Sequence, residues 1–252
     1  IAPFYAPYLT YSYIPETMPF YNTKTPHTVL AYWGTLFSYS DKEESSMKFL
    51  HTQNITPALN LQMEYHMYGG RGLLTNEGTN NRTFTITGNY IGERYVANGG
   101  FISNSIIRNE NGGVRKSSDV LDTLIDAKTI NVNLEEASNR IKKKTFFISH
   151  SYGIPIRFKK DRDSLGQDSL DAGKGTMAYI GHYGEYSHYT KFYTDNIKNS
   201  RAREFYNNNF YIHPSVSADS MRVANLDNRV FIRLQPWDND AIVSHIEGGV
   251  GL

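Results

Sequence analysis

The chain has 252 residues and is nearly neutral, with 26 Lys and Arg against 25 Asp and Glu and a formal net charge of +1. This balance excludes the basic surface typical of nucleic-acid-binding proteins, and no nucleic-acid partner is expected. The absence of cysteine excludes disulfides and thiolate zinc sites. No run of 18 apolar residues exists, which excludes a transmembrane helix but not a transmembrane barrel, because barrel strands are apolar on one face only.

The first 26 residues hold five of the nine prolines of the chain. Proline donates no backbone hydrogen bond, so this segment is expected to be extended and mostly unpaired. Three expected strands follow it: residues 27–37 are apolar at nearly every position, residues 45–55 are mixed, and residues 59–68 (LNLQMEYHMY) alternate. Strand side chains point alternately to opposite faces, so the third strand has one apolar and one polar face.

Further strands are expected at residues 82–91, 95–107, 145–156, 176–193, 229–235 and 241–252. The links between all the strands are residues 38–44, 56–58, 69–81, 92–94, 108–144, 157–175, 194–228 and 236–240. Long and short links alternate, with two imperfect cases. Link 38–44 is short for a long loop, and link 157–175 is long for a turn. Bacterial outer-membrane barrels have short periplasmic turns and long external loops, whereas a β-sandwich gives no reason for this alternation.

The expected strands are about ten to thirteen residues long, against about five or six in soluble proteins. Ten residues cover about 33 Å and, tilted by about 45°, cross about 24 Å of apolar thickness. The sequence therefore predicts an all-β fold, an antiparallel transmembrane β-barrel with up-and-down meander topology and long external loops at residues 69–81, 108–144 and 194–228. Nine strands is an odd number, so residues 27–252 are expected to be part of a larger barrel.

The alternation also predicts which side chains line the barrel and which meet the membrane boundary. The expected pore-lining residues are Asn60, Gln62, Glu64, His66, Thr83, Thr85, Thr87 and Asn89. Walls of this mixed polar kind, without a dominant charge, indicate weak ion selectivity. The candidates for an aromatic girdle at the membrane interface are Tyr32, Trp33, Tyr65, Tyr68, Tyr90, Tyr95, Tyr179, Tyr183 and Trp237.

No arrangement of residues predicts catalysis, and neither a cofactor nor a metal is expected. His182 and His188 share a strand face but lie about 20 Å apart, which is too far to share an ion. Residues 161–166 (DRDSLG) begin like a calcium loop, but Leu165 and Ala172 occupy positions that require oxygen ligands. A looser ion site among the aspartates of residues 161–171 remains an alternative to a solvated acidic turn.

Several stretches resemble the putative porin family of Bacteroidota outer membranes. They are PFYNTKTPHTVLAY (19–32), FLHTQNITPALNLQMEYHMYGGRG (49–72), GNYIGERY (88–95), NENGGV (109–114) and NNFYIHPSVSADS (208–220). The resemblance implies that the chain is the N-terminal part of a larger single-chain β-barrel located in the bacterial outer membrane, with membrane lipid as its surroundings. It supplies no catalytic residues.

Four Asp-Ser/Thr-aliphatic triplets resemble the O-glycosylation signal of the same phylum. Their acceptor residues are Thr123, Ser164, Ser169 and Ser220, all in expected loops, where a glycosyltransferase has access. The alternative is that loops are simply rich in Asp and Ser.

Three functions are open at this point. The first is a porin that passes small hydrophilic solutes by diffusion, and the second is a weakly conducting barrel that serves as a structural subunit of an outer-membrane complex with other outer-membrane or periplasmic proteins. In the second case, plugging the lumen and docking a periplasmic partner are the two roles open to the proline-rich segment. The third is a soluble secreted β-sandwich that binds glycans through its aromatics, which the strand lengths disfavour.

Overall fold

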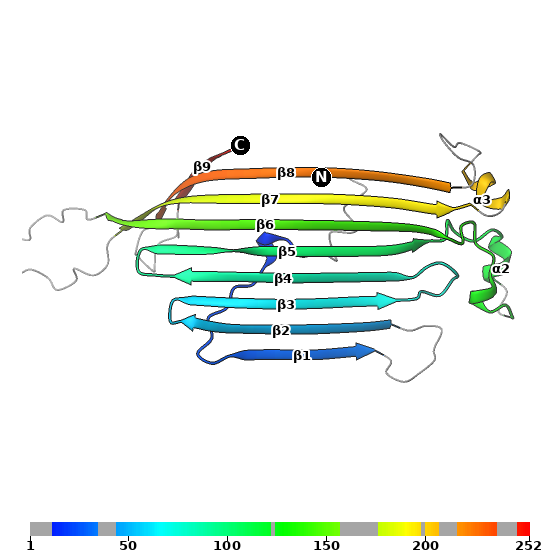
Figure 1. Cartoon of the computed structure of the whole chain (residues 1–252), viewed down its shortest axis with the longest axis horizontal. Coiled ribbons are helices and arrows are strands. Elements are labelled where there is room, and N and C mark those ends of the chain that lie inside the picture. Colours follow the sequence, from blue (N-terminus) through cyan, green and yellow to red (C-terminus); the bar gives the residue numbers. More distant parts are fainter. Residues whose placement is uncertain are drawn as a thin grey trace, which may run out of the picture.

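The computed structural model describes residues 12–34, 44–121, 124–156, 176–197, 200–206, 216–235 and 246–252. Nine antiparallel strands pair in chain order to form one meander sheet (Figure 1). The strands are β1 (His27–Gly34), β2 (Glu44–Thr56), β3 (Leu59–Gly70), β4 (Thr79–Ile91), β5 (Tyr95–Glu110), β6 (Ala137–Ile156), β7 (Thr176–Asn196), β8 (Val216–Gln235) and β9 (Ile246–Gly251). The expected all-β meander of nine strands is therefore confirmed.

The sheet is open, because β1 and β9 form its two edges and are not paired with each other in the described part of the chain. The closed barrel expected from the sequence is not formed by these strands alone. Each edge presents backbone N–H and C=O groups that a further strand can pair with.

Two strands begin well before the sequence suggested. β6 starts at Ala137 and β8 at Val216, so residues 137–144 and 216–228 are strand where long loops were expected. The expectation failed because these stretches lack a continuous apolar face. Pairing is made by the backbone, and β5 and β7 extend beside them as far as Glu110 and Asn196.

The short helices lie at one end of the sheet. Figure 1 shows α2 (Ser117–Leu121) and α3 (Ser200–Phe205) at the same end as the β3–β4 connection, and a single 3-10 turn, η3 (Ala127–Thr129), follows α2. We call this the loop end. The turns at residues 57–58 and 92–94 lie at the opposite end, which we call the turn end. No helix in the described part of the chain is long and apolar enough to cross a membrane.

The register assigns every strand residue to one of two faces, because residues directly opposite in an antiparallel pair lie on the same face. The apolar face is the one that carries Leu61, Ile148 and Ile232. The polar face carries Gln62 and Thr87. The pleat thus separates apolar from polar side chains, and this separation positions the candidate site.

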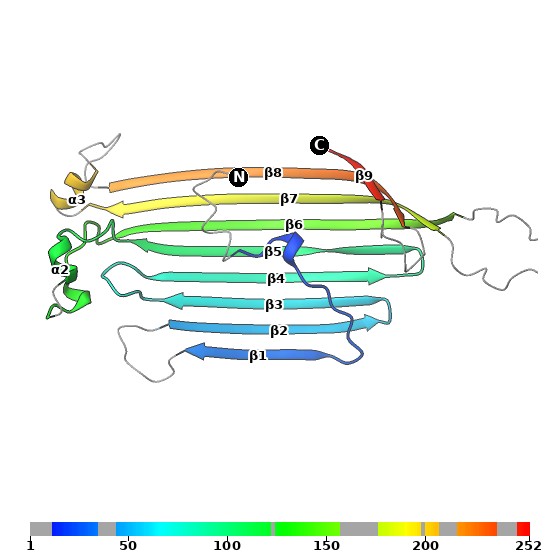
Figure 2. The same cartoon turned by 180° about the vertical axis from the view of Figure 1, so that it is seen from behind.

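Residues 12–26 lie across the polar face, and Figure 2 shows this segment running from the middle of the sheet towards β1. It contains one 3-10 turn, η2 (Pro15–Thr17), and no strand, which fits the unpaired segment expected from its prolines. Met18 of the segment packs on Ile102 and Phe147 in a buried cluster. The covered side of the sheet is therefore the polar one.

A glycine on the polar face tests the closeness of β4 and β5. A Cβ added at Gly100 would lie 2.3 Å from the carbonyl oxygen of Ile86, which cannot move without disturbing the ladder. We expect Gly100→Ala to lower the free energy of unfolding by about 1–3 kcal/mol, the range for overpacking. Gly248→Ala is the control, because nothing lies within 4 Å of its added Cβ. Urea midpoints of the folded protein measure both, and equal midpoints would contradict the packing.

Candidate functional site

The apolar face carries a band of apolar side chains that crosses six strands. One row of directly paired residues reads Met63, Ile86, Phe101, Phe146, Tyr186 and Leu226 from β3 to β8. From this row to the row of Ile154, Ala178 and Leu234, no Asp, Glu, Lys or Arg occurs on the apolar face of β3–β8. Large side chains in the band are exposed, such as Phe146 at 54% and Ile232 at 57%.

Aromatic and histidine side chains form a line across the apolar face that lies at the turn end on β4 and β5 and crosses the band on β6 and β7. Tyr90, Tyr95, His150 and His182 form a continuous row, with ring centroids 6.0, 6.0 and 5.4 Å apart in that order. His182 Nε2 also lies 3.3 Å from Asn228 Oδ1 on β8. Rings with one polar atom suit a boundary between an apolar and an aqueous phase.

The eight residues expected to line a pore all lie on the polar face and pair across β3 and β4. Asn60 is opposite Asn89, Gln62 opposite Thr87, Glu64 opposite Thr85 and His66 opposite Thr83. All except the half-buried His66 are buried. The sequence therefore placed them on one face correctly, and the structure adds that they lie beneath other protein groups.

Asn104 on β5 holds the N-terminal segment by its backbone. The Tyr13 N–H donates to Asn104 Oδ1 at 3.1 Å, and Asn104 Nδ2 donates to the Tyr13 carbonyl at 2.8 Å. Thr83 donates to the same Oδ1 at 3.0 Å and orients the amide. Nearer the turn end, Asn54 Nδ2 donates to Asn22 Oδ1 and its own Oδ1 accepts from the backbone of Thr23. These contacts fix the segment at two places.

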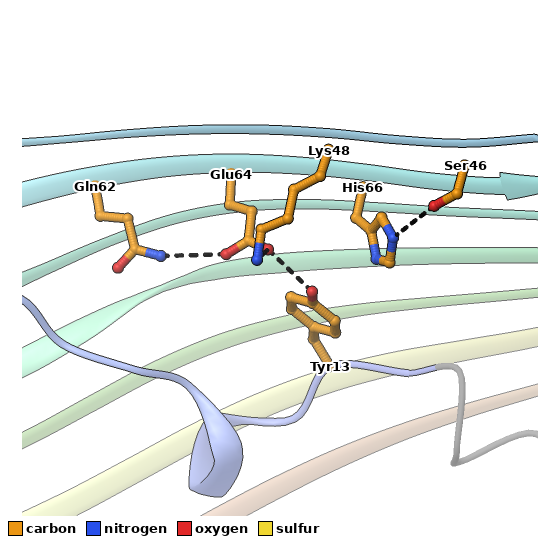
Figure 3. Close-up of polar contacts among 6 residues, drawn as sticks. All are labelled: Tyr13, Ser46, Lys48, Gln62, Glu64 and His66. Carbon is orange, nitrogen blue, oxygen red and sulfur yellow. Dashed lines mark hydrogen bonds and ion pairs between the residues drawn. The ribbon is translucent and has the colours of Figure 1, made fainter. Parts of the chain in front are cut away.

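Glu64 is the centre of a further contact between the segment and the sheet (Figure 3). The Tyr13 hydroxyl donates to Glu64 Oε1 at 2.9 Å, and Lys48 Nζ lies 3.1 Å from the same oxygen. Gln62 Nε2 donates to the other oxygen, Oε2, at 3.5 Å. Only 3% of the Glu64 side chain is exposed, so this charge depends on these partners. Burial and the nearby carboxylate raise the pKa of Tyr13 well above its ordinary value, so its hydroxyl remains a donor.

The polar face of β7–β9 carries a second group of charges that the sequence reading did not single out. Arg229 pairs with Asp227, and Arg233 pairs with Glu247 at 2.6 Å. The Tyr183 hydroxyl donates to Glu185 at 2.7 Å, and the Arg229 guanidinium lies 5.3 Å from the Tyr183 ring centroid. The signal was the alternation in RVFIRL (229–234), which puts Arg229, Phe231 and Arg233 on one face and the aliphatic residues between them on the other.

Side chains from the connections cover the polar face at the loop end. Leu134, Ala137 and Ile197 form a buried cluster, and Tyr206 donates to Asp195 at 2.8 Å. The amide of Asn76 donates to the carbonyl oxygens of three residues in or beside the β5–β6 connection, Glu110, Leu134 and Ala137. The connections thus form a packed cap.

The histidines that the structure describes do not gather into a metal site. Among the described residues, no group of three or more His, Asp or Glu side chains is close enough to hold a metal ion. His150 and His182 are opposite each other on β6 and β7, a pairing that the sequence left open. The aspartates of residues 161–171 lie outside the described residues.

The remaining candidates are the glycosylation acceptors and the aromatic girdle residues, and the structure describes only some of them. Ser220, expected in a loop, lies in β8 opposite Phe192, because the strand begins earlier than its sequence pattern suggested. Thr123, Ser164, Ser169 and Trp237 lie outside the described residues. The girdle candidates on the apolar face are Tyr32, Tyr65, Tyr90 and Tyr95, whereas Trp33, Tyr68, Tyr179 and Tyr183 lie on the polar face.

Asn104 gives a direct test of the segment's attachment. Asn104→Ala removes two hydrogen bonds to the backbone of Tyr13, each worth about 1 kcal/mol. We expect amide hydrogen exchange within residues 12–23 to become about tenfold to thirtyfold faster, measured by mass spectrometry. Thr17→Val is the control, because the Thr17 hydroxyl contacts only Ile14 within the segment. Unchanged exchange in the Asn104 variant would show that the segment is held by other contacts.

The chain was compared with known proteins by family, by sequence and by structure. A family model described as "Putative porin" matches residues 2–247. No curated protein matches the chain. No solved structure matches it. Because the family model spans nearly all of the sequence, including every one of the nine strands at least in part, the chain belongs to the putative porin family.

Proposed function

We propose that this sheet is a section of the wall of an outer-membrane β-barrel, a porin whose polar face surrounds an aqueous lumen through which small hydrophilic solutes diffuse. The observation that carries the proposal is which face is covered. The N-terminal segment lies on the polar face, while the apolar face, with Leu226 64% exposed, has no covering layer among the described residues. A soluble protein buries its apolar face first, because burial of apolar surface drives folding.

The height of the apolar band supports the same function. From Phe146 to Ile154 the band covers eight residue steps on β6, about 26 Å along the strand and about 20 Å across a membrane at a 40° tilt. Side chains at the rows just beyond it extend this height towards the roughly 25 Å expected for an outer-membrane barrel. Tyr90 and Tyr95, which end the band on β4 and β5, then take the place of an interfacial girdle.

The open edges support a larger barrel. β1 and β9 each lack a partner on one side within the described residues. Unpaired backbone groups are costly in a membrane, which only closed sheets avoid. The proposal therefore includes further strands that join β1 to β9, with the connections at the loop end outside the cell.

The placement of the N-terminal segment favours a second candidate. In the barrel the segment would lie inside the lumen, above residues such as Gln62, Thr85 and Thr87 that would otherwise line the pore. A lumen filled in this way conducts weakly. A barrel that serves as a structural subunit, with other outer-membrane or periplasmic proteins as partners, is therefore the alternative to an open porin.

A pair of neighbouring residues tests the membrane assignment. We expect Ile148→Arg, in the apolar band, to destabilise the protein in lipid by about 2–4 kcal/mol, the cost of a base near the middle of the membrane. Ser149→Arg is the matched control, because Ser149 lies next in sequence on the polar face. Urea titration in lipid vesicles, followed by the shift in gel mobility on heating, measures both. In a soluble protein the exposed Ile148 would tolerate arginine as well as Ser149 does.

Conductance in a planar bilayer distinguishes the two candidates. We expect removal of residues 1–26 to raise the single-channel conductance of the full-length barrel severalfold, because residues 12–26 lie on the polar face, which would surround the lumen. The same large conductance with and without the segment would mean an open porin that the segment does not narrow. No conductance from either folded protein would overturn the porin and favour the structural subunit.

O-glycosylation at Thr123, Ser164, Ser169 and Ser220 stays a prediction. Ser220 faces the same side as Arg222 and lies three rows beyond the apolar band at the loop end. That place is outside the cell in the proposed barrel.

A further inference from the structure

Charges are divided between the two faces of the sheet. Every Asp and Glu within the described strands lies on the polar face: Glu44, Glu64, Glu110, Glu185, Asp195, Asp219, Asp227 and Glu247. The apolar face carries no carboxylate on these strands, but it does carry bases. They are Arg82, Arg140, Lys142, Lys144 and Arg222.

These bases are gathered at one margin of the apolar band. Lys144 lies one row beyond Phe146 towards the loop end, and Lys142 and Arg140 follow at successive positions on the same face of β6. At the turn end, the opposite margin carries Tyr95, Tyr152 and Ile180 and no base on the strands. The asymmetry separates this feature from an ordinary scatter of surface charge.

One row within this margin alternates bases and hydroxyls across five strands. It reads Arg82, Ser105, Lys142, Thr190 and Arg222 from β4 to β8. We call it the basic row. Neighbouring strands are about 4.8 Å apart, so successive bases are about 10 Å apart with a hydroxyl donor between them. Positive charge alternating with O–H donors suits oxygen-rich anions.

The basic row is accessible, and no acidic side chain of the described strands lies on its face to neutralise its bases. Arg82, Lys142 and Arg222 are all exposed. Arg82 Nε donates to the neutral amide of Asn80, and Arg222 lies 6.0 Å from the centroid of the Phe192 ring. Neither contact supplies negative charge. Acidic side chains that would normally balance such a row are on the other side of the sheet.

We propose that the basic row, with Lys144 and Arg140 beside it, binds the phosphate groups of lipid headgroups in the leaflet at the loop end. The inference rests on the proposed function, because it takes the apolar band as the part in contact with lipid. Headgroup phosphates lie where the hydrocarbon region ends, and Lys144 and the basic row lie there, one and two rows beyond the band. Arginine and lysine extend their stems along apolar surface while their charges reach the polar layer. A site for an acidic protein would not need to follow the edge of the band across five strands.

The test compares two double variants of the full-length protein that lose the same charge. Lys142→Gln/Lys144→Gln removes two bases from the apolar face. Lys143→Gln/Lys191→Gln removes two from the polar face, and Lys143 lies between the first pair in sequence. The probe is bis-phosphorylated lipid A, titrated in detergent and counted on the folded protein by native mass spectrometry, with monophosphoryl lipid A as the comparison.

We expect the apolar-face variant to bind lipid A about thirtyfold more weakly than the wild type, the factor that two bases near an anionic surface account for. We expect the polar-face variant to bind as the wild type does, and the wild type to prefer the doubly phosphorylated lipid. Equal losses in both variants, or no preference for the second phosphate, would overturn the proposal. Insertion into neutral phosphatidylcholine vesicles is measured separately. If the wild type inserts but does not prefer the doubly phosphorylated lipid, the proposed barrel stands and the phosphate site is overturned. If the wild type does not insert into any vesicle, both the barrel and the phosphate site are overturned.

Discussion

The pairing of β3 with β4 sets Met63 opposite Ile86 and Gln62 opposite Thr87, and every other feature of the sheet follows from this register. Because strand side chains alternate with a period of two, a slip of one residue would move each apolar residue to the polar face. The same register runs unbroken from β4 to β8, with a single irregularity in the sheet near Asn54. In a soluble domain the packed core determines where apolar and polar side chains lie. In this sheet the backbone ladder determines it.

The polar face is a stabilising layer in its own right. Glu64 is buried there with a lysine and a tyrosine hydroxyl, and Asn104 substitutes its amide for a strand partner that Tyr13 does not have. Buried polar groups are tolerated when each finds a partner, and such networks specify one arrangement. Ile102, Phe147 and Met18 add a small dry cluster beside them. The sheet thus binds the N-terminal segment through specific contacts and not through nonspecific hydrophobic association.

Much of this fold was predictable from alternation, and the failures have physical causes. Residues 59–68 and 82–91 alternate so regularly that their strands and faces were predicted correctly, including all eight residues assigned to the polar face. The predicted strands at β6 and β8 were too short. In β6, Lys142 and Lys144 are typical loop residues by hydrophobicity, yet their backbone groups pair with β5. Ser220 was misplaced for the same reason. Tyr13 and Asn104 are 91 positions apart in the sequence, and no local pattern predicts their contact.

That separation in sequence has a consequence for how the molecule assembles. The groups that receive the N-terminal segment come from β2, β3, β5 and β6, so they are side by side only after the ladder from β2 to β6 exists. The segment is made before the strands but docks after them, since closing so long a loop is rewarded only when the receiving surface is complete. A chain stalled part-way through strand addition would therefore carry this segment undocked in the aqueous phase, where a chaperone or protease can recognise an unfinished molecule.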